Sequence, residues 1–268
     1  MGQINIKKEW IDTAIIAAKQ SSEAILKIYK KDFEVIYKQD SSPVTEADKK
    51  SSKIILAELE KTNIPIISEE EENLPFSERK KHALIWVVDP LDGTKEFVNK
   101  NDEFCICIAL IHKQKPIFGL IASPITGKIL LGGPTIGAYY FNFSETFTLN
   151  EKNKIPPLKI NSKKTIAYSR SHFSKDAQKF IETITTKYGT PEFIKKGSAL
   201  KFIDLALGKA DFYPRMAPTM EWDIAAGQAI YESVGGEVLD FSNFEPLYYN
   251  KESLYNPYFI AKNKDLTI

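Results

Sequence analysis

The chain has 268 residues, enough for one large domain or for two packed halves. Hydrophobic residues make up 43% of it and charged residues 26%, a composition that excludes disordered and fibrous proteins and indicates a globular one. Its 36 Lys and Arg and 35 Asp and Glu leave a net charge of +1, so bulk charge gives no reason to expect binding to a nucleic-acid polymer or a membrane surface.

The first part of the chain predicts two helices and then a run of strands. Apolar residues recur at three- and four-residue steps over 10–29, which predicts an amphipathic helix. Thr45 is a candidate N-cap for a second helix, predicted over 46–60. Apolar runs separated by turns predict four short strands, at 64–67, 83–88, 104–111 and 117–123.

A change in composition divides the chain near its middle. Gly, Asn and aromatic residues become frequent over 132–153, and two prolines follow, so we expect an N-terminal half over 1–150 and a C-terminal half over 151–268. The C-terminal half predicts a strand at 164–168 and helices at 174–188, 199–207 and 223–234. Strands and helices are mixed throughout, which predicts an α/β protein.

The only cysteines, Cys105 and Cys107, lie one residue apart in an apolar run, too few and too close for the disulfide framework of a secreted protein. Two residues apart on a strand, they share a face, and we interpret them as buried strand residues rather than metal or redox ligands. Charged residues near the N-terminus interrupt any signal peptide, and no run of roughly 18 apolar residues occurs. We therefore expect a cytoplasmic protein with no integral membrane segment.

Residues 86–94, WVVDPLDGT, join an apolar strand to two carboxylates on either side of a proline. Pro90 fixes one backbone dihedral angle, so we expect Asp89 and Asp92 to point into one space and to leave the Leu91 carbonyl for a cation. Carboxylates and a carbonyl form a hard oxygen site, which selects magnesium, manganese or calcium over zinc or copper. The alternative is an ordinary turn, since Asp, Pro and Gly all favour turns.

Three further features belong with this motif. Gly93 lets an anion approach the main chain closely, and the amides of Gly93 and Thr94 become donors to it. Glu69 begins a run of four acids after an apolar strand, where a solvated loop is the alternative. Asp223 is expected at a helix N-cap, where simple capping is the alternative.

Four carboxylates are thus candidates for one site: Glu69, Asp89, Asp92 and Asp223. Their mutual repulsion is tolerable only if divalent cations neutralise it, which implies two or three metal ions. Two hard cations about 4 Å apart suit in-line phosphoryl displacement, because one activates water and the other stabilises the leaving oxygen. The sequence therefore indicates hydrolysis of a phosphate ester.

The acidic segments carry a family resemblance over nearly the whole chain. In order, they are VTEAD at 44–48, SEE at 68–70, DPLDGT at 89–94 and WD at 222–223. They resemble the lithium-sensitive, magnesium-dependent phosphatase superfamily that includes inositol monophosphatase, fructose-1,6-bisphosphatase and 3'(2'),5'-bisphosphate nucleotidase. Further segments are most similar to the bacterial nucleotidase branch: DGTKEF at 92–97, SRSH at 169–172 and the run over 197–223.

The resemblance implies a layered αβαβα sandwich, α/β in class, in which both halves contribute to one cleft. It implies two or three Mg²⁺ ions, inhibition by Li⁺, and metal ligands at Glu69, Asp89, the Leu91 carbonyl, Asp92 and Asp223. Glu70 is implied to help with a weaker third metal. The resemblance also leaves open a monomer or a homodimer, and a peripheral position at the inner face of the cell membrane.

The same resemblance implies a catalytic pair. Thr94 and Asp48 would hydrogen-bond to each other and draw a proton from the attacking water. The residues alone assign no role to Asp48, for which an exposed acid in the first turn of a helix is the alternative. A small-molecule nucleotide would be bound by Glu69, Leu91, Asp92, Gly93, Thr94, Ser169, His172, Lys201, Arg215 and Asp223.

The substrate is inferred from the residues outside the metal motif. Lys95, Arg170, Lys201 and Arg215 are available to neutralise a second phosphate, and His172 is placed by family analogy near an adenine or its 5'-phosphate. We expect conversion of adenosine 3',5'-bisphosphate to AMP and phosphate, with activity on the sulfated analogue, in sulfate assimilation. The alternatives are an inositol monophosphatase or sugar bisphosphatase with the same metal site, a metal-free glycosidase, and a non-catalytic binding module.

Overall fold

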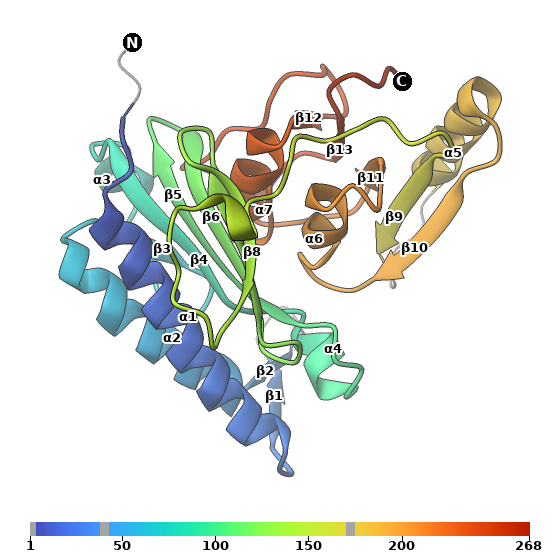
Figure 1. Ribbon diagram of the computed structural model, residues 1–268. Coiled ribbons are helices and arrows are strands. Elements are labelled where there is room, and N and C mark those ends of the chain that lie inside the picture. The colour runs from blue at the N-terminus through green and yellow to red at the C-terminus, as the bar shows by residue number, and fades with distance from the viewer. Residues whose placement is uncertain (1–3, 38–42, 170–174) are drawn as a thin grey trace.

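The structure, a computed structural model, describes residues 4–37, 43–169 and 175–268. Its elements form alternating helical and sheet layers (Figure 1). One outer layer is the helix pair α1 (Lys8–Tyr29) and α2 (Glu46–Leu59), which covers a six-stranded sheet. The central layer contains α6 (Lys201–Ala206) and α7 (Glu221–Ser233), and α5 (Lys175–Tyr188) covers the outer face of a five-stranded sheet.

The six-stranded sheet has the order β3-β4-β5-β6-β7-β8. The strand β3 is parallel to β4, and the other neighbouring pairs are antiparallel. The bounds are β3 (Ile66–Ser68), β4 (Leu84–Asp92), β5 (Cys105–His112), β6 (Lys115–Ser123), β7 (Lys128–Gly133) and β8 (Gly137–Asn142).

The five-stranded sheet has the order β10-β9-β11-β13-β12. Its bounds are β9 (Thr165–Ser169), β10 (Glu192–Lys196), β11 (Phe212–Arg215), β12 (Gly236–Asp240) and β13 (Phe259–Asn263). Smaller elements are the ribbon of β1 (Val35–Tyr37) and β2 (Pro43–Thr45), the short helices α3 (Phe76–Arg79) and α4 (Thr94–Val98), and 3-10 turns at Glu60–Thr62 and Glu151–Asn153.

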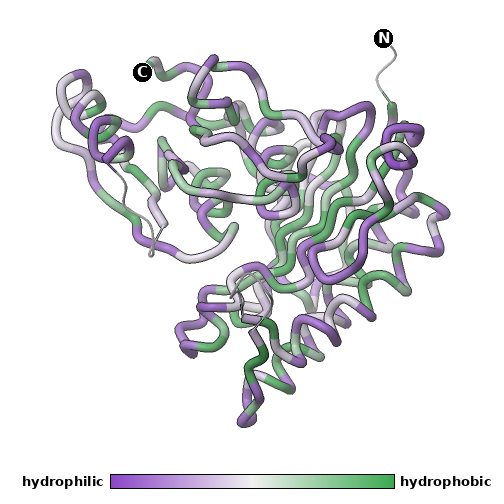
Figure 2. Tube along the Cα trace, turned by 180° about the vertical axis from the view of Figure 1, so that it is seen from behind, coloured by the Kyte–Doolittle hydropathy of each residue, from purple (hydrophilic) through white to green (hydrophobic). Residues whose placement is uncertain are grey.

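Both faces of the six-stranded sheet are buried, which explains its continuous apolar strands. In β5, Ile106 and Ile108 pack in the cluster beneath α1 and α2, while Cys107 and Ala109 pack in the cluster around α7. Alternate side chains of one strand thus serve two cores. Figure 2 shows the strands of this sheet as mainly hydrophobic, whereas the outer helices mix hydrophilic and hydrophobic residues.

The central helix α7 lies directly against the sheet at a glycine. A Cβ built on Gly119 of β6 would lie 2.1 Å from the carbonyl oxygen of Ala226 of α7, so only glycine allows this approach. With α7 held there, its N-terminal turn faces the end of β4. This packing joins the acidic motif of the first half to Asp223 in the second.

The layered αβαβα sandwich is confirmed, together with the two N-terminal helices, the predicted strand that corresponds to β9, and α5, α6 and α7. Thr45 caps α2 as predicted, because its hydroxyl oxygen accepts the amide of Ala47 at 3.1 Å. The division at residue 150 stays a prediction. No helix among the described residues is both long and apolar enough to cross a membrane.

Two features of the first half go beyond what the sequence predicted. The glycine- and aromatic-rich stretch contains β8 and the end of β7, strands that were not predicted and that complete the sheet. The Asp-Pro motif is not the ordinary turn that was its alternative, because β4 continues through Asp92 with a shift in its pairing between Asp89 and Asp92. This irregularity bends the strand end where the two carboxylates lie.

Candidate metal centre

Three carboxylates from two distant segments meet at the end of β4. Asp89 and Asp92 come from β4, and Asp223 comes from the first turn of α7. One oxygen of each lies within 4.8 Å of the others. All three donors are oxygen atoms, so the group fits a hard divalent cation better than a soft one.

The bend of β4 is held in place by local hydrogen bonds. The Leu91 amide donates to Asp89 Oδ1 at 2.9 Å, and the buried Ser51 hydroxyl of α2 donates to the Pro90 carbonyl at 2.5 Å. Gly93 then adopts φ +94°, in the left-handed region that glycine tolerates, and α4 begins. The Leu91 carbonyl oxygen, a predicted metal ligand, lies 3.3 Å from Thr94 Oγ1.

Burial and mutual repulsion act on the same carboxylates. Burial raises the pKa of Asp89 well above its ordinary value, and the charges of Glu69, Asp92 and Asp223 raise it further. The pKa of Asp223 is raised in the same way, first by burial and then by Asp92. A divalent cation among them removes both penalties, since it replaces lost hydration and offsets the repulsion.

Asp92 differs from its neighbours because groups of the second half stabilise its charge. Burial raises its pKa, but a hydrogen bond from the Ala199 amide and the charge of Lys201 act in the opposite direction. Arg215 also lowers the pKa of Asp92. Residues from both halves of the chain therefore hold Asp92 in position.

Glu69 lies beside the three carboxylates without joining their tight group. Its amide donates to the Val88 carbonyl at 3.2 Å, which extends the pairing of β3 with β4 and brings it next to Asp89. Its charge raises the pKa of Asp89 and Asp223, so it shares their electrostatic environment. Glu70 follows it and is half-buried, so the start of the acidic run is not a fully solvated loop.

Asp48 is not the exposed acid that its sequence alone suggested. It is 1% exposed, and its Oδ2 accepts the Thr45 amide at 2.7 Å and the Thr45 hydroxyl at 2.6 Å. Its other oxygen, Oδ1, accepts the Thr94 hydroxyl at 2.9 Å, the contact that the family resemblance implied. Burial raises the pKa of Asp48, and its hydrogen bonds act against that rise.

The expectation that Asp223 is an N-cap is wrong. Met220 is the N-cap residue, and Asp223 stands at the third helical position, where its Oδ2 accepts the Met220 amide at 2.8 Å. Asp48 has the same position in α2. In both helices one carboxylate oxygen is fixed by the helix terminus, which orients the other toward the site.

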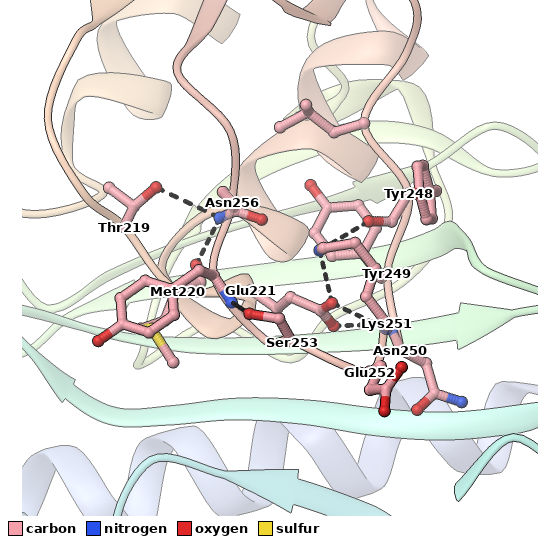
Figure 3. A network of polar contacts seen from close by, with 12 residues as sticks. Thr219, Met220, Glu221, Tyr248, Tyr249, Asn250, Lys251, Glu252, Ser253 and Asn256 are labelled. Carbon is pink, nitrogen blue, oxygen red and sulfur yellow. Dashed lines mark hydrogen bonds and ion pairs between the residues drawn. The ribbon is translucent and has the colours of Figure 1, made fainter. Parts of the chain in front are cut away.

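A buried polar network holds the N-terminus of α7 (Figure 3). Glu221, fully buried, accepts the amides of Asn250 at 2.6 Å and Lys251 at 3.0 Å, and the Lys251 ammonium at 2.6 Å. Asn250 in turn accepts Nη1 of Arg79, at the end of α3, at 2.8 Å. The network thus ties the segment that follows Glu69 to the helix that carries Asp223.

The same loop fixes the residue that caps this helix. The side-chain amide of Asn256 donates to the Met220 carbonyl at 2.6 Å and to the Thr219 hydroxyl at 3.3 Å (Figure 3). Because the Met220 amide holds Asp223, the position of that carboxylate depends on contacts made by the loop after β12.

A pocket opens beside the carboxylates and is lined by both halves. Residues that the sequence pointed to are Asp92, Gly93, Lys95, Ser169, Lys201, Arg215 and Asp223. Residues that it did not single out are Glu96, Ser198, Ala199, Tyr213, Thr219 and Ile224. No local pattern marks this second group, although all of them except Ile224 fall in segments that carried the resemblance. Arg170 and His172 lie outside the described residues.

The two cations of the second half contact the pocket differently. Lys201 is buried, and its ammonium donates to the carbonyls of Lys196 and Ser198 and lies 5.0 Å from the ring centre of Tyr213. The positive charge of Lys201 therefore acts on the pocket from inside the protein rather than from the solvent side. Arg215 is half-buried, donates to the Pro218 carbonyl at 3.4 Å, and has a buried Nε without a partner among the described residues.

Comparisons with known proteins place the chain in one family over nearly its whole length. A model described as "Inositol monophosphatase family" matches residues 6–266, which confirms the resemblance. The "3'(2'),5'-bisphosphate nucleotidase CysQ" of Haemophilus influenzae is 32% identical over 96% of this chain and 94% of its own, and that of Escherichia coli K12 is 34% identical over 93% and 98%. The crystal structure of CysQ from Bacteroides thetaiotaomicron superposes with a TM-score of 0.85 at 38% identity, over 95% of this chain and 97% of that one.

Proposed function

The chain belongs to the inositol monophosphatase family, and on that basis we propose that it is a magnesium-dependent hydrolase of adenosine 3',5'-bisphosphate. The products are AMP and phosphate, and the sulfated analogue is a second substrate. The observation that carries the proposal is the convergence of Asp89, Asp92 and Asp223 beside a pocket lined by three cations, Lys95, Lys201 and Arg215. The names of the relatives, bisphosphate nucleotidases, support the choice of substrate. Such an enzyme serves sulfate assimilation in the cytoplasm, as a monomer or homodimer.

The donor set fits Mg²⁺, two or three ions in all. Glu69, Asp89, Asp92, Asp223 and the Leu91 carbonyl would hold them, and Glu70 would help with a weaker third ion. When bound, such ions polarise phosphoryl oxygens and stabilise charge on the leaving oxygen. Li⁺ is expected to inhibit by competing for one of these positions.

The chain itself supplies the proton acceptor. The Thr94 hydroxyl donates to Asp48 Oδ1, so its own oxygen is left to accept a proton from an attacking water. As that proton reaches Thr94 Oγ1, the original hydroxyl proton passes to Asp48. Burial, which raises the pKa of Asp48, makes it a stronger base for this step.

Other groups orient the substrate. The amides of Gly93 and Thr94 donate to the phosphate that is transferred. Arg215 and Lys201 supply positive charge for the second phosphate, and Ser169 lines the same pocket. A nucleotide with two phosphates uses both the metal centre and these cations, whereas an inositol monophosphate uses only the metal centre.

We test the proposal by phosphate release from adenosine 3',5'-bisphosphate, inositol 1-phosphate and fructose 1,6-bisphosphate, each with Mg²⁺, chelator or Li⁺. We expect the nucleotide to give the highest kcat/KM in Mg²⁺, with turnover lost in chelator and reduced by Li⁺. Equal or faster turnover of inositol 1-phosphate would overturn the substrate but not the metal chemistry. Undiminished turnover in chelator would overturn the metal chemistry.

Glu221→Gln is expected to weaken Mg²⁺ activation, because it loosens the network that positions Asp223. Partners that orient metal ligands typically contribute about 10- to 100-fold to metal affinity, so the half-saturating Mg²⁺ concentration should rise by about that factor. At saturating Mg²⁺ the KM for substrate should change little. Glu237→Gln is the matched control, since it breaks another Glu–Lys pair, with Lys262. An unchanged Mg²⁺ dependence in Glu221→Gln would show that the network does not act on Asp223.

A further inference from the structure

The two cysteines lie directly beneath the metal centre. Both are fully buried on β5 as free thiols, with 4.0 Å between the two Sγ atoms. Their cross-strand partners are the acids of the bent strand, since Cys105 pairs with Asp92 and Cys107 with Asp89. The Sγ of Cys105 lies 3.8 Å from Asp92 Oδ2 and 3.5 Å from the Ser198 hydroxyl.

The two cysteines are buried strand residues, as the sequence predicted, but with Asp92 they also form a second candidate group of metal ligands, different in kind from the first. A carboxylate oxygen of Asp92 and the Sγ atoms of Cys105 and Cys107 all lie within 4.8 Å of one another. Thiolate ligands select zinc-like soft cations, whereas the all-oxygen group selects magnesium-like hard ones. Asp92 is the one residue common to both groups.

The spacing suits tetrahedral coordination. Zn–S bonds of about 2.3 Å place two thiolates of one tetrahedral site roughly 3.8 Å apart. The observed Sγ–Sγ distance of 4.0 Å is close to that value, and the 3.8 Å between Cys105 Sγ and Asp92 Oδ2 is close to the roughly 3.5 Å of a sulfur–oxygen pair in such a site. Asp92 and Ser198 line the pocket and contact Cys105, so these two side chains separate the pocket from the buried thiol.

We propose that a thiophilic divalent cation of the zinc and cadmium class binds Cys105, Cys107 and Asp92, and that it inhibits the enzyme by withdrawing Asp92 from the hard-metal group. On binding, each S–H bond breaks, two metal–sulfur bonds form, and two protons leave to solvent, with no change of oxidation state. A water molecule completes the fourth position. The inhibition rests on the proposed function, while the binding does not.

The test uses CdCl₂ as the probe on the full chain, first freed of metal with a chelator. We expect ultraviolet thiolate-to-cadmium absorbance to saturate at one Cd²⁺ per chain in the wild type. This absorbance should be lost in Cys105→Ser and in Cys107→Ser. If a buried serine disturbs folding, Cys105→Ala and Cys107→Ala take their place and should lose it as well. MgCl₂ should give no such signal. Absence of thiolate absorbance in the wild type would overturn the site.

Inhibition is measured separately, as Mg²⁺-dependent hydrolysis of adenosine 3',5'-bisphosphate in the presence of Cd²⁺. Measured relative to its own activity in Mg²⁺ alone, each cysteine variant should need about tenfold more Cd²⁺ for half-inhibition than the wild type. Equal sensitivity of wild type and variants would show that Cd²⁺ acts at the all-oxygen group, which overturns the inhibitory role. If the wild type hydrolyses none of the phosphate esters, the proposed function fails, and the absorbance titration still decides whether the thiol site exists.

Discussion

Asp92→Asn is expected to lower kcat for phosphate release by about 10²- to 10³-fold, the range found when one preorganised electrostatic group is removed from a reaction centre. Asn has the size of Asp but not its charge, so it weakens the binding of a hard cation to the carboxylate group. The amide of Ala199 can still donate to the remaining side-chain oxygen, which limits the change to electrostatics. The measurement is kcat at saturating substrate over a range of Mg²⁺ concentrations.

Loss of activity in this variant should not reflect unfolding. Burial raises the pKa of Asp92, so its ionised form is destabilised when no metal is present, and a neutral residue of the same shape relieves that cost. In chelator the variant should therefore unfold at the same temperature as the wild type or above it. Asp12→Asn is the control, since Asp12 forms an exposed pair with Lys8. Full activity in Asp92→Asn, or its unfolding at a lower temperature, would contradict the assigned role.

Removing the proton acceptor is the second large effect, expected for both Asp48→Asn and Thr94→Val. Loss of a positioned general base typically lowers turnover by about 10²- to 10⁴-fold. In Asp48→Asn, the new side chain can keep its oxygen toward the Thr45 amide, but its NH₂ group then faces Thr94 and cannot accept the proton. Thr94→Val removes the hydroxyl while keeping the shape of the side chain.

A purely structural role for this pair makes a different prediction. If Asp48 only caps α2, its loss costs about 1 kcal/mol of stability and leaves kcat unchanged. We therefore measure kcat, the half-saturating Mg²⁺ concentration and the unfolding temperature together. Thr94→Ser retains a hydroxyl and should restore most of the turnover lost in Thr94→Val. Equal turnover in the Ser and Val variants would exclude proton transfer through Thr94.

The outer helices α1, α2 and α5 were predictable because each shows one apolar stripe. The same periodicity does not reveal how α7 is placed between two sheets, since that depends on the contact of Gly119 with Ala226. The strands β7 and β8 were missed because Gly132, Gly133 and Gly137 give this hairpin the composition of a loop. Sheet order is set by packing far along the chain, which no local pattern encodes.

The residues of the site were predictable from the sequence where neighbouring residues in the chain determine their geometry. Asp89 and Asp92 end one apolar strand, so their shared direction follows from short-range geometry. The role of Asp48 came only from the family resemblance, although a Thr45-x-x-Asp48 capping box is visible in the sequence. The contact of Cys105 with Asp92 depends on the register of β4 and β5, which residue types alone do not fix.

The most direct test of whether these acids form a metal centre is the binding of Mn²⁺ to the metal-free protein, monitored through the electron paramagnetic resonance signal of the free ion. The folded wild type should bind at least two ions per chain, and Asp89→Asn and Asp223→Asn should each lose binding while circular dichroism stays unchanged. A folded wild type that binds no Mn²⁺, or variants that bind it as the wild type does, would contradict the assignment of Asp89, Asp92 and Asp223 to one metal centre.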